Sequence, residues 1–89
     1  MGKYIVYILR CRDHSLYTGI TTDMTKRLHA HNHLLSGASY TRTRRPVVVV
    51  YQTAACSKSE ALKKEYAIKR LTHAQKERLI VSADESKDH

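Results

Sequence analysis

The chain has 89 residues with a formal net charge of +8, and its six aromatic side chains are all tyrosines. This length suits one small domain, and two isolated cysteines exclude a disulfide framework and a cysteine zinc box. Because the sequence shows no signal peptide and no apolar run of transmembrane length, we expect a cytoplasmic protein with reduced thiols. We also expect a monomer.

The positive charge is concentrated in the body of the chain. Residues 1–82 carry fifteen basic and five acidic side chains, whereas residues 83–89 have a net charge of −2. A body this basic repels itself unless a polyanion is near. We expect that polyanion to be nucleic acid, because no segment has the pattern of an amphipathic membrane helix. A solubility charge or an anionic membrane surface are the alternatives.

The first half of the chain predicts a β-hairpin and a helix. Residues 3–10 are apolar on both faces, which is typical of a strand covered on both sides. A second short strand over residues 16–20 follows a polar turn. Asp23 closes an N-cap signal, so we expect a helix from about residue 23 to residue 35.

The second half predicts a strand and two further helices. Residues 38–46 form a polar, arginine-rich loop, and residues 47–51 form a clear strand. Ser57 begins a capping box that opens a helix to about residue 71, and a third helix spans residues 74–81.

This order, ββαβαα, predicts an α/β chain of the α+β kind. We expect a small three-stranded, mainly antiparallel sheet flanked by three helices. The domain is expected over residues 1–82, with a disordered acidic tail over residues 83–89.

Glu65 is the most informative side chain of the sequence. On the helix after Ser57, it lies near the middle of an apolar stripe that also holds Ala61, Leu62 and Ile68. A carboxylate on an apolar stripe is costly unless its charge is compensated. Two interpretations stay open: a buried ion pair with an arginine of the first helix, or a divalent-metal ligand on the floor of a cleft.

Arg27 and His31 lie four residues apart, so they are neighbours on one face of the first helix. An arginine there can clamp a phosphate and stabilise developing charge, and a histidine can move a proton or position water. The commoner alternative is a surface arginine beside a core histidine. His29 and His33 lie on the polar face and are expected to be surface residues rather than zinc ligands.

Tyr7 and Tyr17 lie on consecutive strands of the predicted hairpin. They share a face of the sheet if the residue numbers of each cross-strand pair have an even sum, a register that the sequence does not fix. Two converging hydroxyls beside a metal can position or deprotonate a water molecule, and two core tyrosines are the alternative. Gly19 allows a backbone or a substrate to approach closely.

The loop after the first helix combines three arginines with two hydroxyls and a tyrosine. Such a set suits phosphate contacts and base stacking, and a solvated basic loop is the alternative. The residues expected to bind nucleic acid here are Tyr40, Thr41, Arg42, Arg44 and Arg45.

Together these residues resemble the GIY-YIG nuclease superfamily. That family has a Gly-Ile-Tyr triplet on one strand and a Tyr-Ile-Gly triplet on the next, and this chain has Ile5-Val6-Tyr7 and Tyr17-Thr18-Gly19. The arginine and histidine of the family's first helix match Arg27 and His31, and the glutamate of its later helix matches Glu65. The first triplet lacks its glycine, and the second has threonine in place of isoleucine.

Short runs around the basic loop resemble the short, stand-alone branch of this superfamily. They are His31-Asn32, Thr41-Arg42 and Arg44-Arg45-Pro46. On this resemblance Asn32 joins the residues expected to bind nucleic acid. The resemblance covers about residues 3–81 of the chain.

The resemblance implies the fold and a metal-dependent cleavage of phosphodiester bonds but no particular substrate, and we expect the substrate of this nuclease to be DNA. Glu65 is expected to hold Mg²⁺ or Mn²⁺, and Tyr7, helped by Tyr17, to activate water with a pKa lowered by nearby cations. Arg27 is expected to stabilise the transition state and His31 to assist proton transfer. We expect structure-specific action in DNA repair or recombination, with a repair protein as partner. The alternative is a non-catalytic nucleic-acid-binding module of the same fold.

Overall fold

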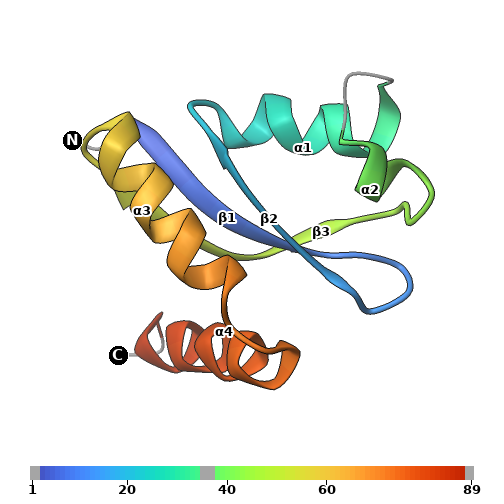
Figure 1. Ribbon diagram of the computed structural model, residues 1–89. Helices are drawn as coiled ribbons and strands as arrows, with labels where there is room; N and C mark the ends of the chain where they lie inside the picture. Colours follow the sequence, from blue (N-terminus) through green and yellow to red (C-terminus); the bar gives the residue numbers. More distant parts are fainter. Residues whose placement is uncertain (1–2, 35–37, 88–89) are drawn as a thin grey trace.

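A computed structural model describes residues 3–34 and 38–87 and contains a three-stranded sheet with helices packed on it (Figure 1). β1 (Tyr4–Arg10) lies between β2 (Leu16–Thr21) and β3 (Val48–Ala55) and is antiparallel to both. This confirms the predicted antiparallel sheet. The helices are α1 (Met24–His33), α2 (Ser39–Arg42), α3 (Lys58–Lys69) and α4 (His73–Lys87).

The predicted caps begin two of these helices. The Asp23 carboxylate accepts a hydrogen bond from the Lys26 backbone N–H at the start of α1. The Ser57 hydroxyl accepts one from the Glu60 backbone N–H, 3.1 Å away, at the start of α3. Each cap satisfies a backbone donor that the first turn of a helix leaves unpaired. At its other end α1 stops at His33, earlier than the expected residue 35.

Two segments differ from the expected fold. Residues 38–46 were expected as a loop, but they include the short helix α2, so the described residues form four helices rather than three. The tail expected to be disordered over residues 83–89 is helical as far as Lys87, and residues 88–89 lie outside the described residues. No glycine or proline follows Ser82, so nothing in the sequence interrupts α4 there.

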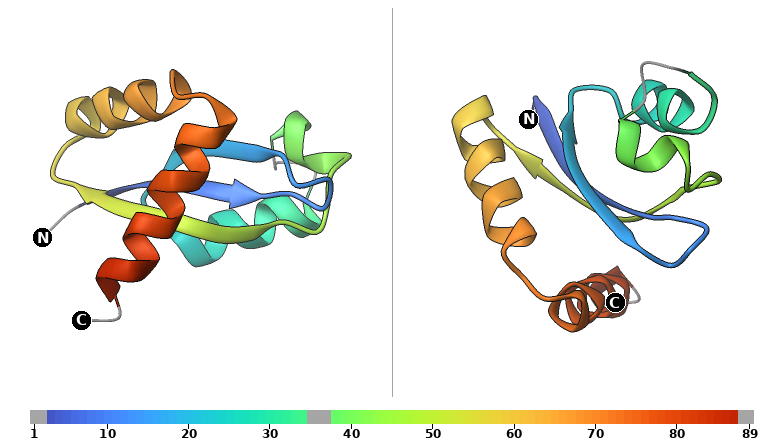
Figure 2. Two further views of the ribbon diagram at one scale, coloured as in Figure 1. Left: turned by 90° about the horizontal axis from the view of Figure 1, so that it is seen from below. Right: turned by 45° about the vertical axis from the view of Figure 1, so that its right-hand side comes forward.

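The sheet is covered on both faces, as the apolar pattern of β1 predicted. Figure 2 shows α1 and α3 on opposite sides of the sheet. The core on the α3 and α4 side consists of Val6, Ile8, Ala55, Ala61, Ile68 and Ile80. The core on the α1 side consists of Tyr7, Leu9, Cys11 and Val47, with Met24 and Leu28 packed against them. Side chains of β1 therefore alternate between the two cores, as the period of a strand requires.

Candidate active site

A pocket of about 540 Å³ lies beside β2, between α1 and α3. Four of the five predicted catalytic side chains line it, and the fifth, His31, lies behind Tyr7. The lining residues are Tyr4, Tyr7, Tyr17, Gly19, Ile20, Thr21, Thr22, Arg27, Lys58, Leu62 and Glu65. Helices α1 and α3 and the hairpin thus bring together residues that are up to 61 positions apart in the sequence.

The register of the hairpin places the two predicted tyrosines on one face. Tyr7 pairs with Gly19 and Leu9 pairs with Tyr17, so the paired residue numbers have an even sum. The ring centroids of Tyr7 and Tyr17 are 6.4 Å apart. Both rings therefore belong to the α1 side of the sheet and reach the pocket from there.

Gly19 makes room for the Tyr7 ring. A Cβ atom at this position would lie 2.5 Å from the Tyr7 hydroxyl oxygen and 3.1 Å from a ring carbon of Tyr17. The first distance is far below van der Waals contact, so any side chain here would push the Tyr7 hydroxyl away from the pocket. The group that approaches Gly19 closely is thus a tyrosine side chain of the site itself, and not a backbone or a substrate as expected.

His31 connects Tyr7 to Thr41 in a buried chain of hydrogen bonds. The His31 Nε2 atom is 2.9 Å from the Tyr7 hydroxyl oxygen, and its Nδ1 atom is 2.8 Å from Thr41 Oγ1. All three side chains are at most 1% exposed. Because both ring nitrogens of His31 have a hydrogen-bond partner, these bonds fix the orientation of the imidazole.

The direction of each hydrogen bond follows from Thr41. Its single hydroxyl proton is donated to the backbone oxygen of Ala38, 2.9 Å away, so Oγ1 accepts from His31 Nδ1. The neutral imidazole then carries its proton on Nδ1, and Nε2 accepts from the Tyr7 hydroxyl. Burial, together with the charges of two nearby arginines, lowers the pKa of His31 to about 4. The ring is therefore neutral at pH 7 and has a lone pair directed at Tyr7.

The pKa of Tyr7 is raised, which corrects the expectation of a lowered pKa. Burial of the phenol raises the pKa most strongly, and it outweighs the hydrogen bond and charge of Arg27, which lower it. Arg27 Nε donates to the Tyr7 oxygen over 3.4 Å. Tyr7 is thus protonated at neutral pH, and a proton leaving its hydroxyl has an acceptor in His31 Nε2.

Glu65 lies at the edge of the buried face of α3, not in its middle as expected. Ala61 and Ile68 are buried, whereas Leu62 is 48% exposed. The Glu65 side chain is 19% exposed, lines the pocket, and forms an ion pair with Lys69 at 3.4 Å. Because the Lys69 side chain is 54% exposed, this ion pair is a weak one that water screens.

The donor set at Glu65 fits a hard divalent cation. Magnesium in proteins keeps several waters and is held by one or two carboxylates together with substrate phosphate oxygens. One carboxylate lining an open pocket is such a set. Across residues 3–34 and 38–87 there is no group of three or more His, Cys, Asp or Glu side chains that could enclose a metal by themselves.

Three of the predicted nucleic-acid-binding side chains lie at the surface, and two of them are connected to Tyr17, which lines the pocket. The rings of Tyr17 and Tyr40 stack with centroids 5.9 Å apart, and the Arg44 guanidinium lies 4.0 Å from the Tyr40 ring centroid. Arg44 also pairs with Asp13 at 3.1 Å. Tyr40 is 40% exposed, and Arg42 is exposed on α2. Tyr17, Tyr40 and Arg44 therefore form a stack that begins at the pocket and ends at the surface.

The other three of that set have their polar atoms occupied within the protein. The Asn32 amide bonds both the N–H and the carbonyl of Val47, at 2.8 and 3.0 Å. Arg45 donates to backbone oxygens at the C-terminal end of α1, where a cation is favourable. Thr41 is buried against His31. These three side chains hold the segment after α1 in place, so we retain Tyr40, Arg42 and Arg44 as candidate nucleic-acid contacts.

Helix α3 contributes two further site residues that were not predicted as such. Lys58 and Leu62 line the pocket together with Glu65. They precede Glu65 by seven and three residues, which places all three on adjacent turns of α3. Helical spacing from Glu65 was therefore the signal that could have identified them, although Leu62 was expected in the core.

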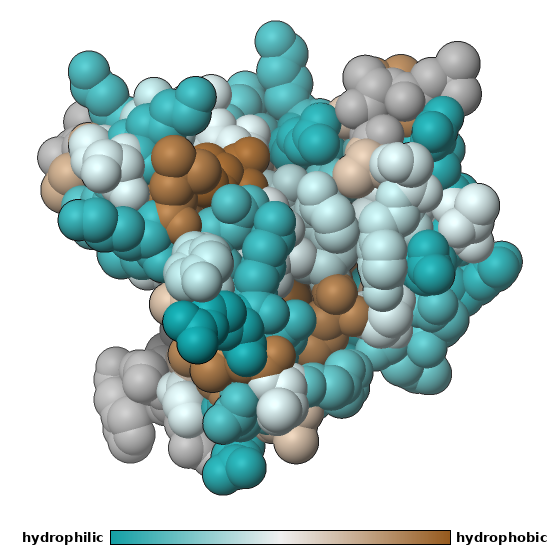
Figure 3. Space-filling model, in the orientation of Figure 1, coloured by the Kyte–Doolittle hydropathy of each residue, from teal (hydrophilic) through white to brown (hydrophobic). Residues whose placement is uncertain are grey.

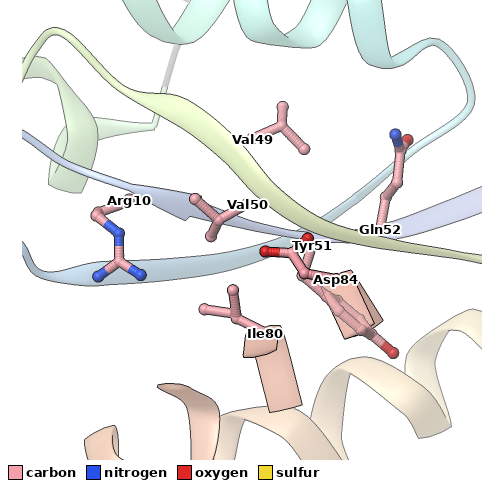
Figure 4. Close-up of a pocket in the computed structure, with 7 residues that line it drawn as sticks. All are labelled: Arg10, Val49, Val50, Tyr51, Gln52, Ile80 and Asp84. Atoms are coloured by element: carbon pink, nitrogen blue, oxygen red, sulfur yellow. The ribbon is translucent and has the colours of Figure 1, made fainter. Parts of the chain in front are cut away.

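The remaining surface features are separate from this pocket. A cavity of about 360 Å³ between β3 and α4 contains none of the predicted catalytic residues (Figure 4). Its Arg10 makes a two-point ion pair with Glu77, with both N–O distances 2.7 Å, which ties α4 to the sheet. His29 and His33 are exposed, as predicted. None of the described helices is long and apolar enough to cross a membrane.

Known proteins resemble this chain over nearly its whole length. A model of the GIY-YIG catalytic domain matches residues 3–78. A UPF0213 protein of Staphylococcus haemolyticus is 52% identical over 80 residues, which are 90% of this chain and 96% of that relative. The NMR structure of a UPF0213 protein of Bacillus halodurans has a TM-score of 0.57 and 45% identity, covering 88% of this chain and 82% of that one. The NMR structure of a protein of E. faecalis has a TM-score of 0.63 and 36% identity, covering 94% and 92%. The chain therefore belongs to the GIY-YIG catalytic-domain family, a nuclease superfamily, and its relatives are UPF0213 proteins.

Proposed function

We propose that this protein is a divalent-metal-dependent nuclease that hydrolyses phosphodiester bonds in DNA. The observation that carries the proposal is the hydrogen-bonded chain from Thr41 through His31 to Tyr7, which ends in the pocket that Arg27 and Glu65 also line. The family supports the class of reaction. The net charge of +8 supports a polyanionic substrate.

Tyr7 and His31 act together as the base. The attacking water gives a proton to the Tyr7 oxygen while Tyr7 passes its own proton to His31 Nε2, so one proton leaves the water and an imidazolium forms. Thr41 keeps its hydrogen bond to Nδ1 throughout. A bound phosphate adds negative charge to the pocket, which raises the pKa of His31 and makes it a stronger base when substrate is present. Tyr17 orients the water from the same face of the sheet.

Arg27 and Glu65 act on the phosphate. Arg27 lies within hydrogen-bond reach of Tyr7, so its guanidinium is placed to contact the phosphate that the activated water attacks and to stabilise its growing charge. Glu65 is the residue that would hold Mg²⁺ or Mn²⁺. When bound, such an ion supplies Lewis-acid stabilisation of the phosphate and the leaving oxygen. Tyr40, Arg42 and Arg44 hold the DNA backbone outside the pocket.

The candidate DNA contacts bear on the substrates. Tyr40, Arg42 and Arg44 are assigned to the DNA backbone, and backbone contacts carry no direct information on base sequence. We therefore propose that the protein acts on DNA of particular structure, as found in repair or recombination, where a repair protein can direct it. We propose further that it does so as a cytoplasmic monomer.

A cleavage panel tests this function. Purified protein is incubated with duplex, single-stranded, flap and branched DNA, with Mg²⁺ or Mn²⁺ and with EDTA. We expect cleavage in the presence of either metal, none with EDTA, and a preference among the structures. Tight binding without cleavage of any substrate would instead identify a non-catalytic nucleic-acid-binding module.

A further inference from the structure

The outer face of α3 carries an exposed aromatic side chain that the mechanism does not use. Tyr66 is 64% exposed. Among the described residues, no other large hydrophobic residue is as exposed. The Arg70 guanidinium lies over its ring, 5.4 Å from the centroid. A tyrosine this exposed adds little to the core, and a rigid ring with a cation beside it is a common element of binding surfaces.

Tyr66 belongs to a ridge that begins at the candidate active site. Four exposed residues spaced four positions apart form one row along the helix. They are Lys58, Leu62, Tyr66 and Arg70. Lys58 and Leu62 line the pocket beside Glu65. We call these four residues the α3 ridge. At 1.5 Å per residue the ridge is about 18 Å long from Lys58 to Arg70.

The chemistry of the ridge matches a single nucleic-acid strand. Its two ends are cationic, its middle is apolar and aromatic, and Figure 3 shows apolar surface set among hydrophilic surface over α3. Surfaces that bind single strands combine positive charge along the backbone with aromatic rings on which bases stack. In a duplex the bases are already stacked on each other and present their phosphates outward, so Tyr66 has no base face to contact. A surface of this kind would bind unpaired nucleotides in preference to paired ones.

We propose that the α3 ridge binds unpaired nucleotides next to the scissile phosphate, with a base stacked on Tyr66 and flanking phosphates on Lys58 and Arg70. The substrate class is then a nucleic acid with a single-stranded segment at the cleavage site. This inference rests on the proposed nuclease function and names its substrate. The charge of the ridge and its continuity with the pocket are the reasons for choosing nucleic acid over a protein partner.

Binding measurements with EDTA present test the ridge without cleavage. The probes are a fluorescein-labelled single-stranded 20-mer and the duplex of the same sequence, followed by fluorescence anisotropy. We expect Tyr66→Ala to weaken single-strand binding by about tenfold and to change duplex binding by less than about twofold, since stacking on one ring accounts for roughly this factor. Tyr66→Phe keeps the ring and should bind as the native protein does. Val81→Ala, on α4 and 53% exposed, is the matched control for losing an exposed apolar side chain.

A second readout uses the absence of tryptophan from the chain. Tyr66→Trp introduces one fluorophore, and stacking of a base should quench its emission on addition of the single strand but not of the duplex. Equal effects of Tyr66→Ala on both probes, no effect on either, or failure of Tyr66→Phe to restore binding would each overturn the ridge. Cleavage of the same single strand by the native protein, with Mg²⁺ or Mn²⁺ in place of EDTA, is measured in parallel. Cleavage alongside a negative ridge result rejects only the ridge. Loss of single-strand binding in Tyr66→Ala without any cleavage by the native protein rejects only the nuclease.

Discussion

Replacing Thr41 with valine tests whether the tautomer of His31 matters for the chemistry. The substitution removes a hydroxyl that accepts from His31 Nδ1 at 2.8 Å and donates to the Ala38 carbonyl at 2.9 Å. Both contacts are buried, so the loss of stability should be about 2 kcal/mol, at roughly 1 kcal/mol for each hydrogen bond. The imidazole can avoid an unpaired Nδ1–H by moving its proton to Nε2. It then donates to Tyr7 and no longer accepts from it.

The expected consequence is a fall in the chemical rate on the order of 10²-fold or more, the usual contribution of a general base. The assay is single-turnover cleavage at saturating DNA, normalised to folded protein at a temperature well below the Tm of every variant. Thr41→Ser keeps the hydroxyl and should retain most of the rate, although it loses a methyl group and about 1 kcal/mol of stability. If Thr41→Val cuts at the native rate per folded molecule, or if Thr41→Ser is equally slow, the tautomer argument is incorrect.

Three further outcomes follow from the same contacts. Thr18 has a hydroxyl buried with no partner among the described residues, so Thr18→Val should raise the free energy of unfolding in urea by about 1 kcal/mol, and a decrease would contradict this. In an NMR titration of the free protein, His31 should remain neutral down to about pH 4, as its burial implies; a midpoint near the ordinary value of about 6.5 would show a solvated ring. Arg27→Ala should lower the saturated cleavage rate with little change in affinity, whereas Arg42→Ala should flatten the slope of log K against log salt by roughly 0.9. Equal loss of affinity in both variants would remove the distinction.

Much of the fold could be predicted because its signals are local. The caps at Asp23 and Ser57 fix where two helices begin, and the apolar run of β1 predicts a strand that is covered on both faces. The sequence did not determine whether Tyr7 and Tyr17 lie on the same face of the sheet. This depends on which residues of β1 and β2 face each other, and the structure resolves it by pairing Tyr7 with Gly19.

The roles of the basic segment could not be predicted because they depend on where it folds back. Arg45 was expected to bind nucleic acid from the composition of the loop, and Asn32 from the family resemblance. Both side chains instead bond to backbone groups that come close only when the segment folds back on α1. Thr41 was assigned to the same surface for the same reason as Arg45. Leu62 belongs to the apolar stripe and was expected to be buried, but it is exposed. A periodic pattern identifies a face of a helix but not the angle at which that face meets the sheet.

The most direct measurement is the nicking of supercoiled plasmid by Glu65→Gln, with Mg²⁺ or Mn²⁺ and with an EDTA control. Lys69→Ala is the matched variant, because it removes the same 3.4 Å ion pair and leaves the carboxylate in place. If Glu65 holds the metal, Glu65→Gln should lose nicking while its DNA affinity and Tm stay close to the native values. Lys69→Ala should nick at close to the native rate. If Glu65→Gln nicks normally per folded molecule, or if both variants lose stability and activity in equal measure, Glu65 has a structural role and the metal-dependent mechanism is contradicted.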